Sequence, residues 1–283
     1  MSGSGPAIAA QLAVVAGARD ARGMTDLADK HFLITGGTSG LGRATVLALA
    51  ERGAWVSFVG RDVERGEAVC RETPRARFLA LDLQARDAAE RVMAFALAAP
   101  PGRLDGAANV ASGTPAMRAL TELDDEGLER DLFDELRGFT RLLRAELRYF
   151  VELGAPSSVV NVSSINGLGA SPRGAAYSAQ KAAVIALSKS AALDCAQRGV
   201  RVNALVPGAF DTPMLRSAMR MMAGDDAAQL PAIEQRYAAL IPLGRLGRPP
   251  EAAAAIAWLL SDASSYVTGS SLILDGGLTS FAR

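Results

Sequence analysis

The residue pair with the most evident chemical use is Tyr177 and Lys181, in the stretch YSAQK. On a helix, residues four apart lie side by side on one face. A free phenol has a pKa of ~10, which is too high for efficient proton exchange at neutral pH. A neighbouring ammonium lowers that pKa because it stabilises the phenolate. The spacing therefore fits a proton-transfer pair, although an exposed Tyr and Lys on a solvated helix face would look the same.

Two other segments favour the proton-transfer interpretation. Ser164 closes the stretch NVSS at the end of an expected strand, where its hydroxyl could hydrogen-bond a substrate oxygen beside the phenol. After the next expected strand, Pro207 and Gly208 turn the chain, and Thr212 places a second hydroxyl beyond the turn.

The elements that must position these side chains alternate between short apolar strands and helices. The expected strands are 31–36, 54–60, 76–83, 104–112, 157–164, 200–208 and 271–277, and the expected helices include 43–53, 84–99, 121–153, 175–198 and 250–261. Continuous apolar strands that alternate with helices indicate a parallel sheet covered on both faces. We therefore expect an α/β fold, a single doubly wound Rossmann domain over 24–283 with a seven-stranded parallel sheet.

A glycine-rich turn follows the first expected strand and opens the first helix. The stretch TGGTSGLG spans Thr35 to Gly42. Glycine there lets the backbone approach a pyrophosphate, and the helix N-terminus supplies free N–H groups. In this strand–turn–helix context the pattern predicts a dinucleotide site, with contacts from Gly36, Thr38, Ser39, Gly40, Leu41 and Gly42.

The end of the second expected strand reads FVGRD and bears on the choice of cofactor. An Arg there pairs with a 2′-phosphate, whereas an acidic residue accepts from a free ribose hydroxyl. Arg61 directly after Gly60 favours NADP over NAD. Asp62 could reach the ribose, or it could cap the helix that follows.

Residues 211–247 interrupt the alternation between the last two strands. The segment is helical in parts and rich in methionine, including Met214, Met219, Met221 and Met222. It could be a surface excursion, but it begins where open α/β sheets bind ligands, which favours a substrate lid.

Composition excludes several classes of protein. Thirty basic and thirty acidic residues give a formal net charge of zero, unlike the basic surface of a nucleic-acid binder. A single histidine and two distant cysteines make a Cys/His metal site and a disulfide unfavourable, as in a cytoplasmic protein with reduced thiols. No run of transmembrane length occurs, so no membrane partner is expected. Within residues 1–23 the stretch AIAAQLAVVAGA is apolar, like a signal-peptide core, but no basic region precedes it. We therefore expect a flexible extension rather than a targeting segment.

Together these motifs resemble the short-chain dehydrogenase/reductase family of single-domain enzymes, over about 30–277. The matching stretches are the glycine turn, LDL, NVSS, YSAQK, RVNALVPG, PLGRLGRPPE and YVTGSSLILDGG. The resemblance implies that Tyr177 is the general acid/base, that Lys181 binds the nicotinamide ribose and lowers the Tyr pKa, and that Ser164 polarises the substrate carbonyl. It also implies cofactor contacts from Asp82, Leu83, Asn109, Tyr177, Lys181, Pro207, Gly208 and Thr212, and pairing of the two long helices across a two-fold axis in a homodimer or homotetramer.

The sequence departs from the family pattern at two places. The usual Asn-Asn-Ala-Gly after the fourth strand is Asn109-Val110-Ala111-Ser112, and the Asn of Asn-Leu-x-Gly is Glu135. A carboxylate at 135 could accept from a water linked to Lys181 or pair with Lys181 directly, which would raise the Tyr177 pKa. A shift of register would instead leave it on a solvent face.

The sequence thus predicts an NAD(P)-dependent oxidoreductase, with NADP favoured, that transfers hydride between nicotinamide and a ketone or secondary alcohol. Substrate contacts are expected from 113–118, 165–173 and 211–240. The alternatives are a catalytically weak NADP-binding sensor or partner-binding module, motivated by Glu135, Val110 and Ser112, and an NAD-dependent enzyme that oxidises a cyclic diol or steroid-like alcohol.

Overall fold

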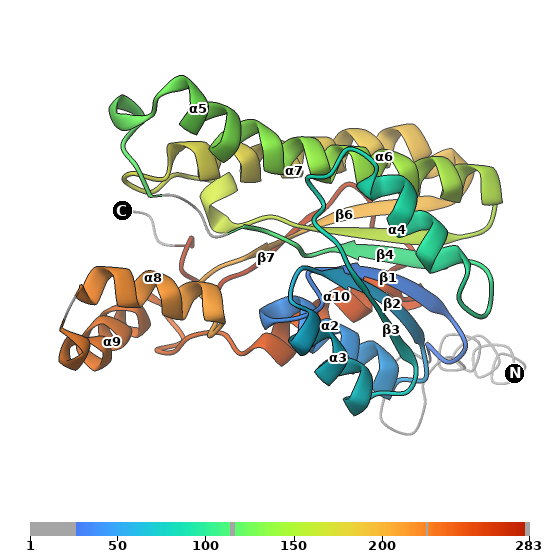
Figure 1. The fold of residues 1–283 in the computed structure, drawn as a ribbon, viewed down its shortest axis with the longest axis horizontal. Helices are drawn as coiled ribbons and strands as arrows, with labels where there is room; N and C mark the ends of the chain where they lie inside the picture. Colours follow the sequence, from blue (N-terminus) through green and yellow to red (C-terminus); the bar gives the residue numbers. More distant parts are fainter. Residues whose placement is uncertain (1–26, 114–116, 225, 281–283) are drawn as a thin grey trace, which may run out of the picture.

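The fold is a seven-stranded parallel sheet between two layers of helices (Figure 1). The computed structural model describes residues 27–113, 117–224 and 226–280. In these residues the strands run in the order β3-β2-β1-β4-β5-β6-β7. Their bounds are β1 His31–Thr35, β2 Trp55–Gly60, β3 Ala76–Ala80, β4 Gly106–Asn109, β5 Ser157–Val162, β6 Val200–Pro207 and β7 Ser271–Leu274. The predicted doubly wound architecture is confirmed.

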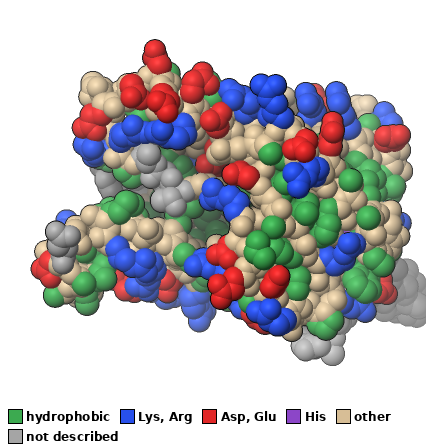
Figure 2. Space-filling view, viewed as in Figure 1, with side chains coloured by type: hydrophobic (Ala, Val, Ile, Leu, Met, Phe, Trp, Pro, Cys, Tyr) green, Lys and Arg blue, Asp and Glu red, His purple; other side chains and the backbone are tan. Residues whose placement is uncertain are grey.

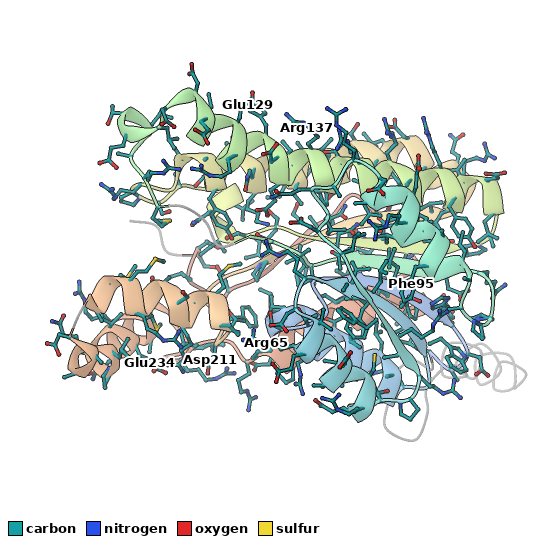
Figure 3. The ribbon with its side chains drawn as sticks, in the orientation of Figure 1. Arg65, Phe95, Glu129, Arg137, Asp211 and Glu234 are labelled. Atoms are coloured by element: carbon teal, nitrogen blue, oxygen red, sulfur yellow. The ribbon has the colours of Figure 1, made fainter. Side chains whose placement is uncertain are left out.

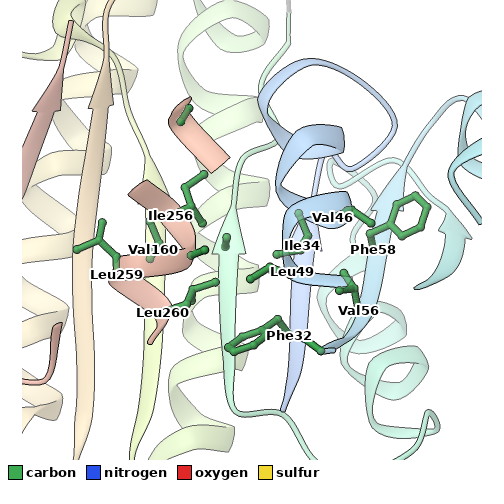
Figure 4. Packing of buried hydrophobic residues seen from close by; sticks show 14 of the residues in the cluster. Phe32, Ile34, Val46, Leu49, Val56, Phe58, Val160, Ile256, Leu259 and Leu260 are labelled. Atoms are coloured by element: carbon green, nitrogen blue, oxygen red, sulfur yellow. The ribbon is translucent and has the colours of Figure 1, made fainter. Parts of the chain in front are cut away.

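In the part of the chain that the structure describes, three long helices cover each face of the sheet, which explains the continuous apolar strands. One layer holds α2 (Gly40–Glu51), α3 (Val63–Glu72) and α10 (Pro249–Leu260); the other holds α4 (Ala88–Leu97), α6 (Glu135–Leu153) and α7 (Ala175–Cys195) (Figure 1). Figure 4 shows the first layer's core, where Phe32 and Ile34 of β1 pack near Val46 and Leu49 of α2 and Ile256 of α10.

The prediction of one helix over 121–153 was wrong in part. The segment contains a 3-10 turn (η1, Leu120–Glu122), a short helix α5 (Asp125–Leu128), a π-helical stretch (η2, Glu129–Asp134) and then α6. The break has a local cause, because the Asp124 side chain accepts from the Gly127 N–H at 2.8 Å and starts a new helix. The fourth strand is also shorter than expected, since only Gly106–Asn109 pairs with its neighbours.

Residues 211–247, the lid segment, form a small helical unit beyond the C-terminal end of β6 (Figure 1). It contains α8 (Pro213–Ala223), η5 (Ala227–Gln229) and α9 (Leu230–Leu240), and its own core is built on Met219, Ile241 and Leu246. Figure 3 labels Asp211 and Glu234, which both pair with Arg216. The two ends of the unit are tied together, because the Asp211 N–H donates to the Gly247 carbonyl at 2.8 Å.

The described residues include no helix long and apolar enough to cross a membrane. Within the same residues, no group of His, Cys, Asp and Glu is arranged to hold a metal ion. The expectation of a flexible extension at 1–23 concerns residues outside those that the structure describes.

Candidate active site

The predicted catalytic residues come together at the carboxyl edge of the sheet. Ser164 follows β5 and is the N-cap of a 3-10 turn (η3, Ile165–Gly167), while Tyr177 and Lys181 lie one turn apart on α7. The Lys181 ammonium lies 5.6 Å from the centroid of the Tyr177 ring. The Ser163 hydroxyl donates to the Lys181 carbonyl at 2.7 Å and so joins the end of β5 to α7. Packing, not only helical spacing, therefore fixes this arrangement.

Burial governs the ionisation of the pair. The pKa of Tyr177 is raised, chiefly because burial disfavours the phenolate; the interaction with Ser164 lowers it, and the negative charge of Glu135 raises it. The pKa of Lys181 is lowered by burial, since the side chain is 5% exposed, and Glu135 opposes this. Glu135 thus favours the charged ammonium and disfavours the phenolate.

Glu135 faces Lys181, and it also hydrogen-bonds Ser112, the residue at the other position where the sequence departs from the family pattern. Its Oε1 lies 3.9 Å from Lys181 Nζ and accepts from the Ser112 hydroxyl at 2.8 Å. Its Oε2 accepts from the Gly113 N–H at 3.0 Å. The two substitutions, Ser112 and Glu135, therefore form one hydrogen-bonded unit, and Glu135 does not lie on a solvent face. Residues 114–116 of the expected substrate loop lie outside the described residues.

A chain of buried polar side chains runs beneath the site. The Asn109 amide nitrogen donates to Glu146 Oε2 at 2.8 Å and to Asn161 Oδ1 at 3.0 Å. The Asn161 side-chain amide in turn donates to the Ser188 hydroxyl at 2.9 Å, and that hydroxyl donates to the Val184 carbonyl. The chain links α6, β4, β5 and α7, the elements that carry or adjoin the site. Both amide hydrogens of Asn109 are used internally, so only its carbonyl oxygen remains for the expected role toward a cofactor.

Glu146 was missed by sequence reasoning. Its side chain is fully buried on α6, its Oε1 has no hydrogen-bond partner, and burial raises its pKa to about 8 although the Asn109 hydrogen bond lowers it. The available signal was its place on the apolar stripe of the helix, four residues after Leu142 and four before Phe150.

The glycine turn has the close packing that a cofactor loop requires. A Cβ on Gly36, whose φ is +71°, would lie 2.8 Å from the Ala111 backbone, and one on Gly42 would lie 2.2 Å from the Gly36 carbonyl oxygen. Ser39 is the N-cap of α2, and its side chain makes no capping hydrogen bond. The first N–H groups of α2 are therefore not capped by the Ser39 side chain, and they lie in a closely packed glycine turn. This arrangement fits the binding of a pyrophosphate. Thr35, also missed, holds the facing loop by accepting from the Val110 and Ala111 N–H groups.

The ends of β2 and β3 supply the residues expected near the adenosine. Arg61 is exposed, whereas Asp62 accepts from the Arg65 N–H at 3.0 Å and pairs with the Arg65 side chain. Asp62 is therefore a helix cap, the simpler of its two interpretations. Asp82 is exposed and accepts from the Gln84 N–H, and the Leu83 carbonyl packs against Gly138 of α6.

The turn after β6 brings the lid segment to the glycine loop. Pro207 ends β6, and the Gly208 N–H donates to the Leu274 carbonyl. The two segments approach closely here, because a Cβ on Gly208 would lie 2.7 Å from Asp275. Thr212 is the N-cap of α8, and its methyl would lie 3.4 Å from a Cβ on Gly40. Most of the expected cofactor residues thus line one edge, with Thr212 facing Gly40.

A parallel sheet with a glycine turn and polar side chains at its carboxyl edge is typical of nucleotide-binding α/β proteins. Comparison with known proteins gives the family. A family profile described as enoyl-(acyl carrier protein) reductase matches residues 36–279. The chain is 38% identical over 257 residues to 2,5-dichloro-2,5-cyclohexadiene-1,4-diol dehydrogenase of Sphingobium indicum, covering 90% of this chain and 99% of that protein. It is also 38% identical to cis-4-hydroxycyclohexanecarboxylate dehydrogenase of Sinomonas cyclohexanicum, covering 89% and 97%.

Solved structures agree with the sequence relatives. The crystal structure of levodione reductase superposes with a TM-score of 0.83 at 32% identity, covering 90% of this chain and 99% of that chain. The chain belongs to the short-chain dehydrogenase/reductase family. It is an NAD(P)-dependent oxidoreductase acting on CH–OH and C=O groups. The alternative of a non-catalytic sensor or partner-binding module is not favoured, because the relatives named here are dehydrogenases and reductases.

Proposed function

We propose that Tyr177 is the general acid/base of this reaction, assisted by Ser164 and Lys181. The observation that carries the proposal is the packing of a buried ammonium against the Tyr177 ring, at the edge where the Ser164 hydroxyl interacts with the phenol. Helix α7 alone would place Tyr177 and Lys181 together, but only the end of β5 brings Ser164 to them.

Each side chain has a definable step. Nicotinamide, when bound, supplies or accepts the hydride. In reduction, Ser164 donates a hydrogen bond to the substrate carbonyl oxygen and Tyr177 gives its phenolic proton to that oxygen; in oxidation, both steps reverse. Ser164 Oγ accepts from the Asn166 N–H at 3.2 Å, so its own hydrogen is directed to the side of Tyr177, where the substrate oxygen would lie. The charge on Lys181 stabilises the phenolate left by the transfer.

Glu135 tunes this pair. Its negative charge raises the pKa of Tyr177 and opposes the loss of charge on Lys181. We assign it a positioning and electrostatic role that moves the pH optimum of turnover upward.

NADP is the preferred cofactor in this proposal. Arg61 is exposed at the end of β2 and has no ion-pair partner among the described residues, while Asp62 is occupied by Arg65. A guanidinium at this position suits a 2′-phosphate better than a ribose hydroxyl.

The substrate we propose is a ring-shaped secondary alcohol or its ketone. Support comes from the names of three relatives, which refer to a cyclohexadiene diol, a hydroxycyclohexane carboxylate and levodione. The lid segment 211–247 would cover it, and the exposed Met221 and Met222 offer adaptable apolar contacts. Residues 117–118 and 165–173 would form the opposite wall.

A homodimer or homotetramer in the cytoplasm completes the proposal. Support for self-association is an apolar and arginine-rich groove of about 270 Å³ along α6, lined by Phe133, Leu136, Arg137, Thr140, Arg141 and Arg144. Figure 2 shows Lys and Arg side chains gathered along this edge. Support for the compartment is that Cys70 and Cys195 are both free.

The proposal is tested with Tyr177→Phe. NADPH oxidation with levodione and NADP⁺ reduction with cis-4-hydroxycyclohexanecarboxylate should fall by a factor on the order of 10³, while NADPH binding measured by fluorescence titration stays within two-fold. Tyr266→Phe is a matched control and should retain turnover, because the Tyr266 side chain is fully exposed outside the lid segment. If Tyr177→Phe turns over at the parent rate, the assignment of Tyr177 is wrong. If the parent turns over no ring-shaped alcohol or ketone, the substrate class is wrong.

A further inference from the structure

Arg173 has a backbone conformation that its side chain does not favour. It precedes α7 and has a φ of +61°, in the left-handed region that residues with a Cβ rarely adopt. Such a conformation persists only where surrounding contacts hold it. The contacts of Arg173 therefore indicate which part of the structure holds this backbone conformation in place.

The whole guanidinium of Arg173 binds one short segment, 117–122, that follows the β4 loop. Nη1 and Nη2 donate to the two carboxylate oxygens of Glu122 at 3.0 and 2.7 Å. Nε donates to the Met117 carbonyl at 3.3 Å. Glu122 is also held from its own side, because it accepts from the Ala119 N–H at 3.2 Å. A fork that uses all three nitrogens is far more specific in geometry than a single surface ion pair.

The backbone makes the same connection beside the ion pair. Arg118 and Gly174 form an isolated parallel β-bridge. Gly174 is the N-cap of α7, so the bridge ends three residues before Tyr177. The ion pair and the bridge together hold segment 117–122 against the start of the helix that carries the proposed acid/base.

The connection continues to Ser164. Ser171, two residues before Arg173, accepts from the Asn166 amide nitrogen at 3.2 Å, and the Asn166 N–H donates to Ser164 Oγ. A Cβ on Gly174 would lie 2.4 Å from Ser171 Oγ, so this corner is closely packed. Movement of Arg173 would therefore disturb both side chains that we propose to meet the substrate oxygen.

We propose that Arg173 and Glu122 form a strap that fixes the distance between segment 117–122 and the edge carrying Ser164 and Tyr177, and that this distance determines how tightly a ring-shaped substrate is held. The inference rests on the proposed function for its substrate. Arg173 and Glu122 are positioning residues, since they act through the segments that they join. Both side chains are about half exposed, at 54% and 47%, and can be exchanged without burying a charge.

The test is a charge swap. Arg173→Glu and Glu122→Arg each place like charges together and should raise the KM for levodione about five-fold, the effect expected of a well-formed exposed pair. The turnover number and the Kd for NADPH should change less than two-fold, and the KM for the small ketone acetone should change less than that for levodione. The double swap should restore the levodione KM to within two-fold of the parent. Glu122→Gln, a milder change, should shift KM in the same direction.

Lys30→Glu is the matched control, because the exposed Lys30–Asp262 pair lies at the opposite end of β1. It should leave all these constants unchanged. An unchanged KM in both single charge reversals, or a double swap no better than the singles combined, would overturn the strap.

A second measurement separates this inference from the proposed function. Amide hydrogen exchange in segment 117–128 should be faster in each single variant and return to the parent rate in the double swap. If no substrate is turned over, exchange still decides: recovery in the double swap supports the strap, and exchange equal to the parent in the single variants refutes it.

Discussion

The buried carboxyl of Glu146 should make the stability of this protein fall as pH rises. Its pKa is raised from 4.5 to about 8 by burial. Between those values the folded chain holds one proton that the unfolded chain releases, so the free energy of unfolding decreases with pH. The decrease is about 1.4 kcal/mol per pH unit and levels off above the folded pKa. Over the full interval of about 3.5 units the loss is about 5 kcal/mol.

Glu146→Gln removes this dependence. Glutamine is neutral at every pH, has nearly the same shape, and its carbonyl oxygen can accept from Asn109 as Glu146 Oε2 does at 2.8 Å. Near pH 5 the free energies of unfolding of the variant and the parent should differ by less than about 1 kcal/mol, since both folded chains carry a neutral side chain. At pH 8 the variant should be the more stable by about 4 kcal/mol. Replacing a buried, hydrogen-bonded side chain would thus stabilise the protein at alkaline pH.

Urea unfolding of the cofactor-free protein, followed by circular dichroism from pH 5 to pH 9, measures the effect. Glu152→Gln is the control, because Glu152 is exposed on the same helix and its loss should leave the pH profile parallel to that of the parent. Parallel profiles for Glu146→Gln and the parent would refute the reasoning, since they would mean that Glu146 does not keep its proton on folding.

Two further predictions concern the cofactor and the catalytic pair. Arg61→Ala should weaken NADPH binding roughly ten- to hundred-fold, the worth of a charge-assisted hydrogen bond, with NADH binding within two-fold. Arg65→Ala should change neither, and equal losses for both nucleotides would contradict the proposed role of Arg61. Glu135→Asn should lower the pKa of Tyr177 and of Lys181, because a negative charge is removed. The acid limb of the pH–rate profile for alcohol oxidation should therefore move to lower pH, and an unchanged profile would show that Glu135 does not act on the pair.

The sequence predicted the fold correctly because the signals of the fold are local. Strands such as β1 (HFLIT) and β2 (WVSFVG) are mostly apolar and buried along most of their length, and their composition indicates this without any knowledge of their neighbours. The break at Asp124 was predicted poorly, since the apolar pattern of 121–153 is helical throughout and a single capping hydrogen bond divides it. The role of Asp62 was left open for the same reason: a cap and a ribose contact require the same residue at the same place.

The sequence by itself determined that Tyr177 and Lys181 share a helix face and that a bare glycine turn precedes α2, because helical period and glycine content act within a few residues. The tertiary structure decided which distant residues meet. It joined Ser112 to Glu135, buried Glu146 against Asn109, and tied Arg173 to Glu122. These contacts depend on how β4, α6 and α7 pack across the sheet, and no local pattern encodes a distance between segments. The proposed proton-transfer pair could thus be predicted from five residues. The sequence left two positions open for Glu135, beside Lys181 or on a solvent face, and only the folded chain decided between them.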